Sequence, residues 1–594
     1  MDGTKLPEMP ALGLAPGMKK ENIDPDKVVA AWLEKLDWWF QSRQDLASLF
    51  IDNCWWRDIL GFAWDFTTKR GVKDIGAYLE GRTITNLQPS TGGLKPILLD
   101  IGGMVWIQSG FTFNNAHGNG RGFVRLANVS DGEWRAWIVF TQLEELSKQK
   151  EVEAARNRSH AAAARIPHDN GVTHESQVLI VGAGQAGVSL AARLGSMGVR
   201  ALLVDRHGRI GDSWRARYET CTLNTPTFTD HYPFLKYPEN WPRWLSRDQV
   251  ADFMEHYAQL MGLDVRLGTS VTSVKRDEPA DRFIVELEGP EGRQTLTPRH
   301  VVLATGVFSD EPVMPDVPGM DIFAGRLYHS SKHRTARDVP DVASKRVVVI
   351  GPGTSGHDVA QDYVNHGAKS VTLVQRSPIF SLSAEAWETI QLGLWSMPGL
   401  TTEEADVVGN SLPLAVIRTM SIGLTRALAD FDKDMIAGLR AAGLALRTGE
   451  DGYGLADHQL IEGGRYYIDQ GANDMIIDGR IKVLRCEGGV ARLDAGGVEL
   501  ADGRRAEADV VVFATGYRHN ITTVRRLMGD DVADSMPRFG LLDEEQERAG
   551  WWRPTGVRRF WYMTGSFMHC RQFSQALALQ IAAAEAEAKQ PGTL

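Results

Sequence analysis

Two glycine clusters with the same internal spacing are the residues of this chain best suited to bind a nucleotide. The clusters are Gly182, Gly184 and Gly187, and Gly351, Gly353 and Gly356. Each follows a strand-like run, 177–181 or 346–350, and precedes a helix-like one. A strand that enters a tight glycine turn and then a helix can hold a pyrophosphate on the N–H groups of the helix start. Because 60 of the 594 residues are Gly, the flanking strands carry the evidence rather than the spacing alone.

The end of the next strand in each unit indicates which nucleotide binds, because a side chain there meets the adenosine ribose. The first unit ends this strand on Asp205, whose carboxylate suits a ribose without a 2′-phosphate, as in FAD or NAD. The second unit has no carboxylate there and continues with Arg376 and Ser377. A charge-assisted contact from Arg376 would favour the 2′-phosphate of NADPH, although NADH is not excluded as the nucleotide. The alternative is that Arg376 is a solvated surface side chain.

Composition predicts an ordinary multidomain enzyme. Hydrophobic residues make up 43% of the chain, enough for about three domains with full cores. Sixty-five Lys and Arg against 75 Asp and Glu leave a net charge of −10, which argues against nucleic acid or an anionic membrane as a general partner. Four scattered cysteines exclude a disulfide framework and a zinc site, so no metal is predicted. Without a signal-like N-terminus or a long apolar run, we expect no membrane span and a cytoplasmic location.

Residues 24–147 predict a small α+β domain. Asp24 can cap a helix that starts at Pro25, and apolar residues recur there at helical spacing. Four strand-like runs, 103–107, 110–113, 122–126 and 134–140, are separated by Gly and Asn, which favours antiparallel pairing. Residues 148–176 are polar, Ala-rich and without aromatic residues, so we expect a linker.

With residues 49–58, this order of elements resembles the cone-shaped fold of the nuclear-transport-factor and SnoaL type. Such cones sometimes carry an acid–base pair, and Asp58, Asp65 and His117 are the candidates for one. The alternative is that tryptophans fill a core or an apolar wall, with Arg57 and Asp58 as a local ion pair. These tryptophans are Trp55, Trp56, Trp64 and Trp106.

From residue 177 onward the chain resembles the class B flavin monooxygenases, which include flavin-containing monooxygenases and Baeyer–Villiger enzymes. Residues 323–329 match the F-x-G-x-x-x-H pattern of that family and lie between the two nucleotide units, as in its members. The segment 210–215 resembles the family's G-G-x-W stretch, and 513–517 resembles its F-A-T-G-Y stretch. The subgroup that it resembles is the type II flavin-containing monooxygenases, some of which carry an N-terminal cone.

The resemblance implies an α/β fold with two Rossmann-like domains, one for FAD and one for NADPH, preceded by the small α+β cone. We expect the FAD domain to comprise 177–320 and a return segment 517–594, with the NADPH domain at 321–516. An apolar helical insertion, 379–467, is expected to cap the flavin rather than anchor the chain in a membrane, because charged residues interrupt it. A helix over 572–589 is expected to point its N-terminus at the flavin.

The resemblance also implies site residues. Asn224 is expected to contact the flavin edge, and His329 either links the domains during nucleotide movement or is structural. Thr354 stands where the family has Asn, and His333 where it has an aromatic residue; both positions lie near the nicotinamide in relatives. The expected cofactor-binding residues are Gly182, Gly184, Gly187, Asp205, Trp214, Arg215, Thr305, Ser330, Gly351, Gly353, Gly356, Arg376, Ser377 and Thr515.

The chemistry implied by the resemblance is monooxygenation. NADPH reduces FAD, O₂ adds to give a flavin C4a-hydroperoxide, and one oxygen atom passes to a small organic substrate. Baeyer–Villiger oxidation of a ketone and oxygenation of nitrogen or sulfur both stay open, and a homodimer is possible. The rival functions are an NAD(P)H oxidase that makes hydrogen peroxide and a flavin disulfide reductase, which needs a cysteine pair that this chain lacks.

Overall fold

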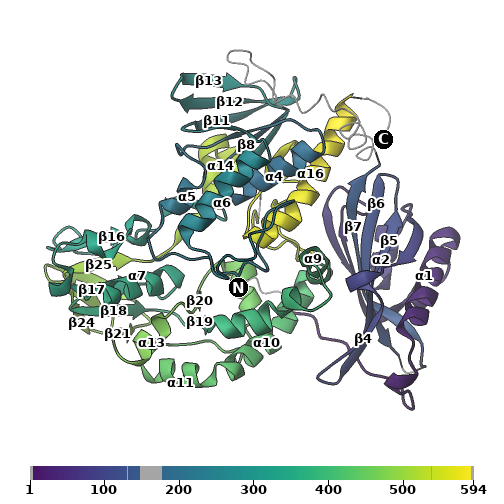
Figure 1. The fold of residues 1–594 in the computed structure, drawn as a ribbon, viewed down its shortest axis with the longest axis horizontal. Coiled ribbons are helices and arrows are strands. Elements are labelled where there is room, and N and C mark those ends of the chain that lie inside the picture. Colours follow the sequence, from purple (N-terminus) through teal and green to yellow (C-terminus); the bar gives the residue numbers. More distant parts are fainter. Residues whose placement is uncertain (1–4, 130, 148–176, 537, 590–594) are drawn as a thin grey trace.

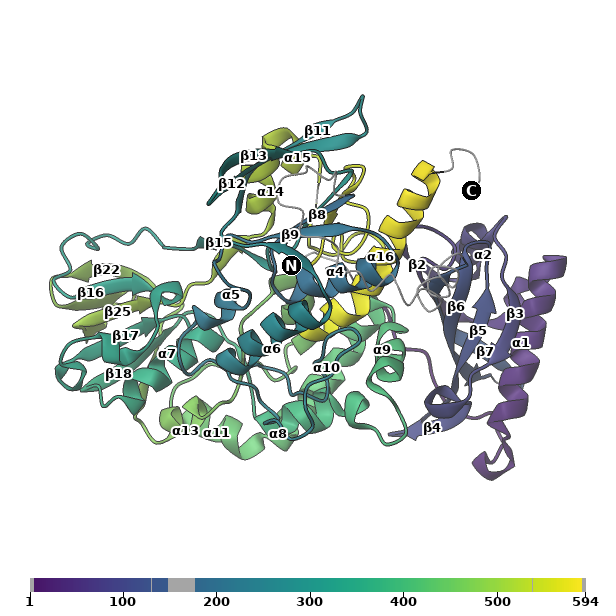
Figure 2. The ribbon, with the colours of Figure 1, turned by 45° about the horizontal axis from the view of Figure 1, so that its top comes forward.

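The computed structural model describes residues 5–129, 131–147, 177–536 and 538–589 (Figure 1). It divides into a sheet-and-helix unit formed by the N-terminal residues and a larger body that contains both glycine clusters (Figure 2). The expected linker, 148–176, lies outside the described residues. No single helix of the described ranges is long and apolar enough to cross a membrane, although α9 (Thr402–Asn410) and α10 (Leu414–Phe431) together pass that test as a pair bent by 102°.

The N-terminal unit is built on one mixed sheet with the strand order β2-β1-β7-β6-β5-β3, in which β4 also pairs with β5. Helix α1 (Pro25–Ser42) begins where Asp24 accepts a hydrogen bond from the Lys27 N–H, as expected, and lies along the outer side of this sheet (Figure 2). The other elements are α2 (Val72–Leu79) and the strands β1 (Phe50–Ile59), β2 (Phe66–Arg70), β3 (Thr85–Pro89), β4 (Ile97–Ile101), β5 (Met104–Asn114), β6 (Gly118–Asn128) and β7 (Trp134–Leu146).

One sequence expectation for this unit is wrong. The runs 103–107 and 110–113 form a single strand, β5, because Gly110 continues the pairing with β6 opposite Phe123 instead of making a turn. A Cβ at Gly110 would lie 2.7 Å from the Ser90 hydroxyl. This glycine therefore marks a close approach of two segments, which is the other common reason for glycine in a strand.

The first glycine cluster belongs to a five-stranded parallel sheet with the order β10-β9-β8-β14-β27. Strand β27 comes from the C-terminal part of the chain and pairs with β14, so the chain returns to this sheet at its end. The elements are β8 (Val178–Val181), α4 (Gln185–Ser196), β9 (Ala201–Val204), α5 (Asp212–Arg215), α6 (Arg247–Leu260), β10 (Asp264–Arg266), β14 (His300–Leu303) and β27 (Phe560–Tyr562). A three-stranded sheet extends from this unit: β11 (Ser270–Asp277), β12 (Arg282–Gly289) and β13 (Gly292–Leu296).

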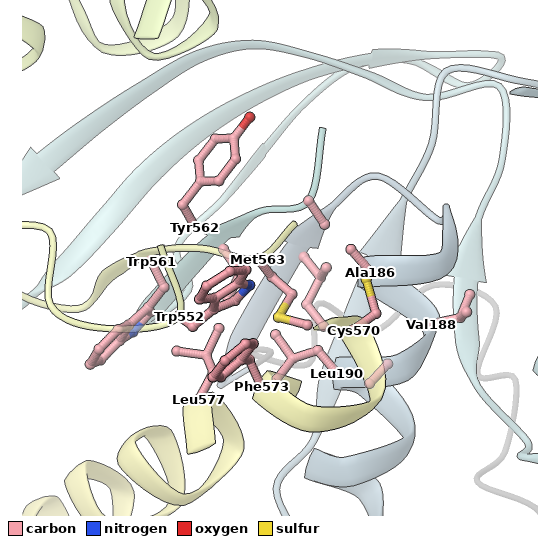
Figure 3. Packing of buried hydrophobic residues seen from close by; sticks show 14 of the residues in the cluster. Ala186, Val188, Leu190, Trp552, Trp561, Tyr562, Met563, Cys570, Phe573 and Leu577 are labelled. Carbon is pink, nitrogen blue, oxygen red and sulfur yellow. The ribbon is translucent and has the colours of Figure 1, made fainter. Parts of the chain in front are cut away.

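The last helix, α16 (Phe567–Lys589), packs against α4, the helix that opens at the first glycine cluster. It begins five residues before the expected start at Gln572. Figure 3 shows the contact: Leu190 of α4 lies near Cys570 and Phe573 of α16, with Trp552 stacked on Phe573 at 4.1 Å between ring centroids. The final helix is thus part of the core of the first nucleotide unit.

The second glycine cluster belongs to another five-stranded parallel sheet, ordered β16-β25-β17-β18-β21. Its elements are β16 (Arg326–His329), β17 (Arg346–Ile350), α7 (Thr354–Asn365), β18 (Ser370–Gln375), α13 (Ala472–Ile477), β21 (Ile481–Arg485) and β25 (Val510–Phe513). The chain passes between the two units along an antiparallel pair, β15 (Phe308–Pro312) and β26 (Tyr517–His519). A separate small sheet is formed by three strands that precede β25 in the chain: β22 (Val490–Asp494), β23 (Gly497–Leu500) and β24 (Arg505–Glu507).

The insertion starts and ends at two short parallel strands, β19 (Phe380–Leu382) and β20 (Tyr466–Ile468). Between them lie mainly helices, as expected: α8 (Ala384–Ala386), α9 (Thr402–Asn410), α10 (Leu414–Phe431), α11 (Lys433–Ala441) and α12 (Leu455–Asp457). Two short helices, α14 (Ile521–Met528) and α15 (Asp530–Asp534), follow β26. The mixed α/β fold with two dinucleotide-type sheets agrees with the expected class.

Candidate active site

A single large cavity, about 1540 Å³ in volume, is lined by both glycine turns. Most of the expected site residues line it. They are Gly182, Gly184, Asp205, Trp214, Asn224, Thr305, Ser330, Gly351, Gly353, Thr354, Arg376, Ser377 and Thr515. Segments far apart in the sequence therefore meet around one space that is large enough for two nucleotides.

The two turns have the same backbone geometry. Gly182 and Gly351 have φ values of 110° and 115°, a conformation that L side chains rarely adopt. A Cβ on Gly187 would lie 1.9 Å from the Gly182 carbonyl oxygen, and one on Gly356 would lie 1.8 Å from that of Gly351. The first and third glycines thus allow the turn and the helix to pack closely.

The middle glycine of each cluster has a different role. A Cβ at Gly184 or Gly353 would meet no protein atom within 4 Å, and both residues line the cavity. The Cβ of a side chain there would lie in the open space in front of the helix N-terminus. This is the arrangement required for a pyrophosphate to approach the backbone N–H groups of α4 and α7.

Asp205 lies at the end of β9 with its carboxylate beside the first turn. It accepts hydrogen bonds from the N–H groups of Ala183 at 2.7 Å and of His207 at 2.8 Å. Burial works to raise the pKa of this carboxyl, but the hydrogen bonds from His207 and Ala183 outweigh it and hold the pKa below its usual value. Asp205 is therefore an anionic acceptor at neutral pH, as contacts to ribose hydroxyls require.

The corresponding position of the second unit is different. Gln375 is fully buried, donates to the carbonyls of Ser377 and Ala445, and accepts from the Ala445 N–H at 2.7 Å. It fixes the end of β18 to the insertion and cannot also reach a ligand. Arg376, the next residue along the chain, lines the cavity with an exposed side chain. The second unit therefore has no carboxylate at the position of Asp205 and presents a positive charge beside it.

Three hydroxyl side chains at the cavity wall hold neighbouring segments together. The Thr354 Oγ1 donates to the Tyr466 carbonyl at 3.0 Å, which ties the start of α7 to the end of the insertion. Thr515 donates to the carbonyl of Val313 at 2.5 Å, and the Thr305 Oγ1 lies 3.1 Å from the Tyr562 hydroxyl. Each of these threonines positions backbone that lines the cavity.

Some expected site residues do not line the cavity. The Arg215 guanidinium is bonded to Asp212, Asp252 and Glu255, so it braces α5 against α6. His329 is buried, accepts a hydrogen bond from the Ser331 N–H at 3.1 Å, and has its pKa lowered by burial. His329 thus lies at the end of β16 and is not among the residues that line the cavity. Gly187 and Gly356 do not line the cavity either; each packs against the carbonyl of the first glycine of its turn.

His333, the departure from the family pattern, lines the cavity and is part of a buried chain of hydrogen bonds. Its Nε2 lies 2.9 Å from the Asp362 carboxylate and its Nδ1 lies 2.9 Å from the Tyr328 hydroxyl. The Tyr328 hydroxyl in turn lies 2.7 Å from that of Tyr363. Both ring nitrogens are occupied by protein partners, so the ring presents a fixed face to the cavity.

The sequence motifs missed several charged residues of the cavity wall. Asp358 follows Thr354 by one helical turn on α7, so a helical-spacing argument from Thr354 could have found it. Five arginines carry no motif: Arg206, Arg217, Arg334, Arg465 and Arg526. Arginines on this wall suit the phosphates of two dinucleotides.

The candidate acid–base residues of the N-terminal unit are engaged with separate partners. Asp58 is fully buried and accepts hydrogen bonds from Thr141, Tyr78 and two backbone N–H groups, while burial raises its pKa to about 6. Asp65 is paired with Arg553, and His117 packs on Trp64 at 4.8 Å between ring centroids. The expected ion pair of Arg57 with Asp58 is wrong, since Arg57 binds Glu547 of the larger body.

Comparisons with known proteins agree with the two-nucleotide architecture. A family model described as pyridine nucleotide-disulphide oxidoreductase matches residues 179–391. The chain is 33% identical over 359 residues to indole-3-pyruvate monooxygenase YUCCA1 of Oryza sativa subsp. japonica, a match that covers 59% of this chain and 79% of that relative.

Two solved structures share the fold. Cyclohexanone monooxygenase bound to epsilon-caprolactone matches with a TM-score of 0.52 and 17% identity, over 70% of this chain and 88% of that chain. Oxidised steroid monooxygenase bound to NADP matches with a TM-score of 0.50 and 20% identity, over 70% of this chain and 86% of that chain. At these identities the likeness concerns the fold alone.

Proposed function

The chain belongs to the flavin-dependent monooxygenase family, and from this premise we propose that it transfers one oxygen atom of O₂ to a small organic substrate at the expense of NADPH. It is an oxidoreductase whose cofactors are FAD and NADPH. The observation that carries the proposal is the single cavity lined by both glycine turns. Two nucleotides held there have a common space in which a nicotinamide and a flavin can meet.

Each turn is assigned one cofactor by the side chain at the end of the strand that follows it. Gly184 leaves room for the FAD pyrophosphate, and the anionic Asp205 suits the hydroxyls of its ribose. Gly353 leaves room for the NADPH pyrophosphate, and Arg376 with Ser377 suits its 2′-phosphate. Reduced FAD supplies the activation of O₂, and the protein's part is to bind, orient and exclude water.

The insertion is our candidate for the part that selects the substrate. Residues at both of its ends, Ile379 and the segment 463–466, line the cavity. Asp406 of α9 is joined to Arg571 of α16 by two hydrogen bonds of 2.7 and 2.8 Å, so the insertion is tied to the helix that packs on the first unit. We propose that its apolar side chains decide whether a ketone, a thioether or an amine reaches the flavin.

A product panel tests the function and its reaction class. Purified enzyme with FAD, NADPH and O₂ is offered ketones, thioethers and amines, and products are identified by mass spectrometry. An ester or lactone from a ketone assigns Baeyer–Villiger oxidation, whereas a sulfoxide or N-oxide assigns heteroatom oxygenation. NADPH consumption that yields only hydrogen peroxide with every compound would favour the NAD(P)H oxidase.

A flavin disulfide reductase is disfavoured by the cysteines. Such an enzyme needs two cysteines that exchange electrons beside the flavin. All four cysteines of this chain are buried and free: Cys54, Cys221, Cys486 and Cys570. Cys221 lines the cavity, but no second cysteine lines it. The cavity therefore lacks the pair of cysteines that the disulfide chemistry in the name of the matching family model would need.

For the N-terminal unit we propose a structural role in a domain of the SnoaL-like type spanning 24–147. Arg57 extends from β1 into the larger body, where its guanidinium binds both carboxylate oxygens of Glu547 at 2.7 and 2.8 Å. The same guanidinium donates to the carbonyl of Asn410 at 2.6 Å, at the bend between α9 and α10. Arg125 of β6 donates to Ser411 at 2.7 Å. Two arginines thus hold the insertion in place.

Removing Arg57 tests this role. Arg57→Met leaves Glu547 buried without its counter-charge, and we expect a loss of about 3–5 kcal/mol in the free energy of unfolding, measured with denaturant. Limited proteolysis should show earlier cleavage between α9 and α10. The matched control is the double variant Arg57→Met with Glu547→Gln, which removes the unpaired charge and should recover much of the stability. An unchanged unfolding curve for Arg57→Met would contradict the proposed clamp.

A further inference from the structure

Three carboxylates line the nucleotide cavity, and two of them have cationic or N–H partners. Asp205 accepts from His207 and the Ala183 N–H, and Asp310 is paired with Arg206 and with Arg526. Asp358 is different: its carboxylate accepts a hydrogen bond from the Tyr218 hydroxyl at 2.5 Å, and within the described ranges no ion pair joins it to an arginine, lysine or histidine.

No cation is among the groups that shift the pKa of Asp358 itself, although Arg217 lines the same cavity and acts on the neighbouring Tyr218 and Cys221. The groups that bear on Asp358 electrostatically are Tyr218, Cys221, Tyr467 and Asp469, each neutral or acidic. Burial raises the pKa of Asp358 to about 7, Asp469 adds to the rise, and the Tyr218 hydroxyl opposes it. A desolvated carboxylate that lacks a counter-charge is stabilised by any cation that enters its cavity.

Asp358 also lies where the two units meet. It is on the same face of α7 as Thr354, one turn further along, and both line the cavity. Tyr218 comes from the first unit, directly after α5, and its ring centroid lies 6.3 Å from that of His333 in the second unit. A backbone hydrogen bond of 2.9 Å from Glu219 to Arg334 joins the same two segments.

We propose that Asp358 is the counter-charge of the oxidised nicotinamide ring and that Tyr218 is the positioning residue that holds its carboxylate toward the cavity. This proposal rests on the proposed function, because it takes NADPH as the reductant. The phosphates of both cofactors are anionic and suit the arginines of the wall. When hydride leaves NADPH, its ring becomes cationic, and this charge is the one that Asp358 complements.

The consequence is that the protein favours NADP⁺ over the reduced form once the hydride has left. A ligand shifts an equilibrium only by its different affinity for the two states, and an ionised carboxylate provides that difference between a cationic and a neutral ring. The preference requires ionised Asp358, so it is present above the pKa near 7 and lost as the pH falls below it. The bound cation itself favours the ionised carboxyl and extends the preference to somewhat lower pH.

The test measures binding, without turnover. Oxidised enzyme with FAD bound is titrated with NADP⁺ and with tetrahydro-NADP, a redox-inert analogue whose ring is neutral, and the dissociation constants come from calorimetry or from the flavin absorbance. At about pH 8.5 we expect wild-type enzyme to prefer NADP⁺, and Asp358→Asn to lower that preference about tenfold. At about pH 5.5, where Asp358 is protonated, wild type and Asp358→Asn should show the same ratio.

Two further variants separate a charge effect from a structural one. Tyr218→Phe keeps the ring but removes the hydrogen bond to the ionised carboxylate, so the pH at which the NADP⁺ preference appears should rise. Asp310→Asn removes a cavity carboxylate that is paired with arginines, and it should leave the ratio of the two affinities unchanged.

The outcomes are distinct. A preference for NADP⁺ that survives Asp358→Asn at high pH overturns the proposal, and so does an equal loss of affinity for both ligands, which would make Asp358 a structural residue. If wild-type enzyme with FAD binds neither ligand, the assignment of the second unit to NADPH fails, and the proposed function fails with it.

Discussion

The two glycine units of this protein have the same backbone and opposite chemistry at the end of the next strand. Their first glycines share a left-handed conformation, with φ values of 110° and 115°, and their third glycines pack against the carbonyl of the first at nearly the same distance. Beyond the turn they differ, because Asp205 offers an anion and Arg376 a cation. Under the proposed assignment, the turn recognises the pyrophosphate that FAD and NADPH share, and the strand end recognises the part of the ribose that distinguishes them.

The largest effects are expected when a side chain is placed at the middle glycine of each unit, because this tests whether each turn binds its own nucleotide. Gly184→Val adds a side chain whose Cβ meets no protein atom within 4 Å, so we expect a folded but colourless protein that has lost FAD. Gly353→Val should instead give a yellow protein that keeps FAD and whose flavin NADPH no longer reduces under anaerobic conditions. Absorbance spectra before and after addition of NADPH measure both effects.

The matched controls are the third glycines. Gly187→Val and Gly356→Val would force a Cβ to within about 2 Å of a carbonyl oxygen, so they should lower the yield of folded protein rather than remove one cofactor selectively. If Gly184→Val kept its FAD, or if both middle-glycine variants lost the same cofactor, the assignment of one nucleotide to each turn would be wrong.

A smaller effect is expected from the cation of the second unit. Arg376→Ala removes a charged contact to the 2′-phosphate, which should cost about 1.5–3 kcal/mol in NADPH binding. NADH lacks this phosphate, so the KM for NADPH should rise much more than the KM for NADH in steady-state reduction assays. Equal changes for the two nucleotides would show that Arg376 does not meet the 2′-phosphate.

The smallest effect concerns the anion of the first unit. Asp205→Asn keeps the shape but removes a charged acceptor for ribose hydroxyls, and we expect FAD affinity to fall by about 1–2 kcal/mol, measured by reconstitution of the apoprotein. Asp205→Asn should leave the ratio of the KM values for NADPH and NADH unchanged. A shift in that ratio would mean that Asp205 faces the other nucleotide.

Much of this arrangement could be predicted because it is local. A glycine turn, the strand before it and a carboxylate at the next strand end all lie within residues 178–205, and hydrogen bonds within that span fix their geometry. The cap of α1 by Asp24 was predictable for the same reason. The cofactors FAD and NADPH followed from these motifs and from the family resemblance.

The sequence could not predict contacts between side chains that lie far apart along the chain. Arg215 follows a family motif, yet its guanidinium is taken by Asp252 and Glu255 of α6. Arg57 has an aspartate beside it in the chain but binds Glu547, which folding brings to it from the C-terminal part. That Asp358 has no ion pair within the described ranges depends on which side chains surround it, and no motif records that. Nor does the sequence select between a ketone and a heteroatom.

The central claim is that oxygen reaches a substrate instead of ending as peroxide. The most direct test supplies the enzyme with FAD, NADPH and O₂ labelled with the heavy oxygen isotope, together with the substrate found in the panel. We predict a product that carries one labelled oxygen atom, formed nearly in step with the NADPH consumed. Labelled hydrogen peroxide in an amount equal to the NADPH consumed, with no labelled product from any ketone, thioether or amine, would contradict the account and identify an oxidase.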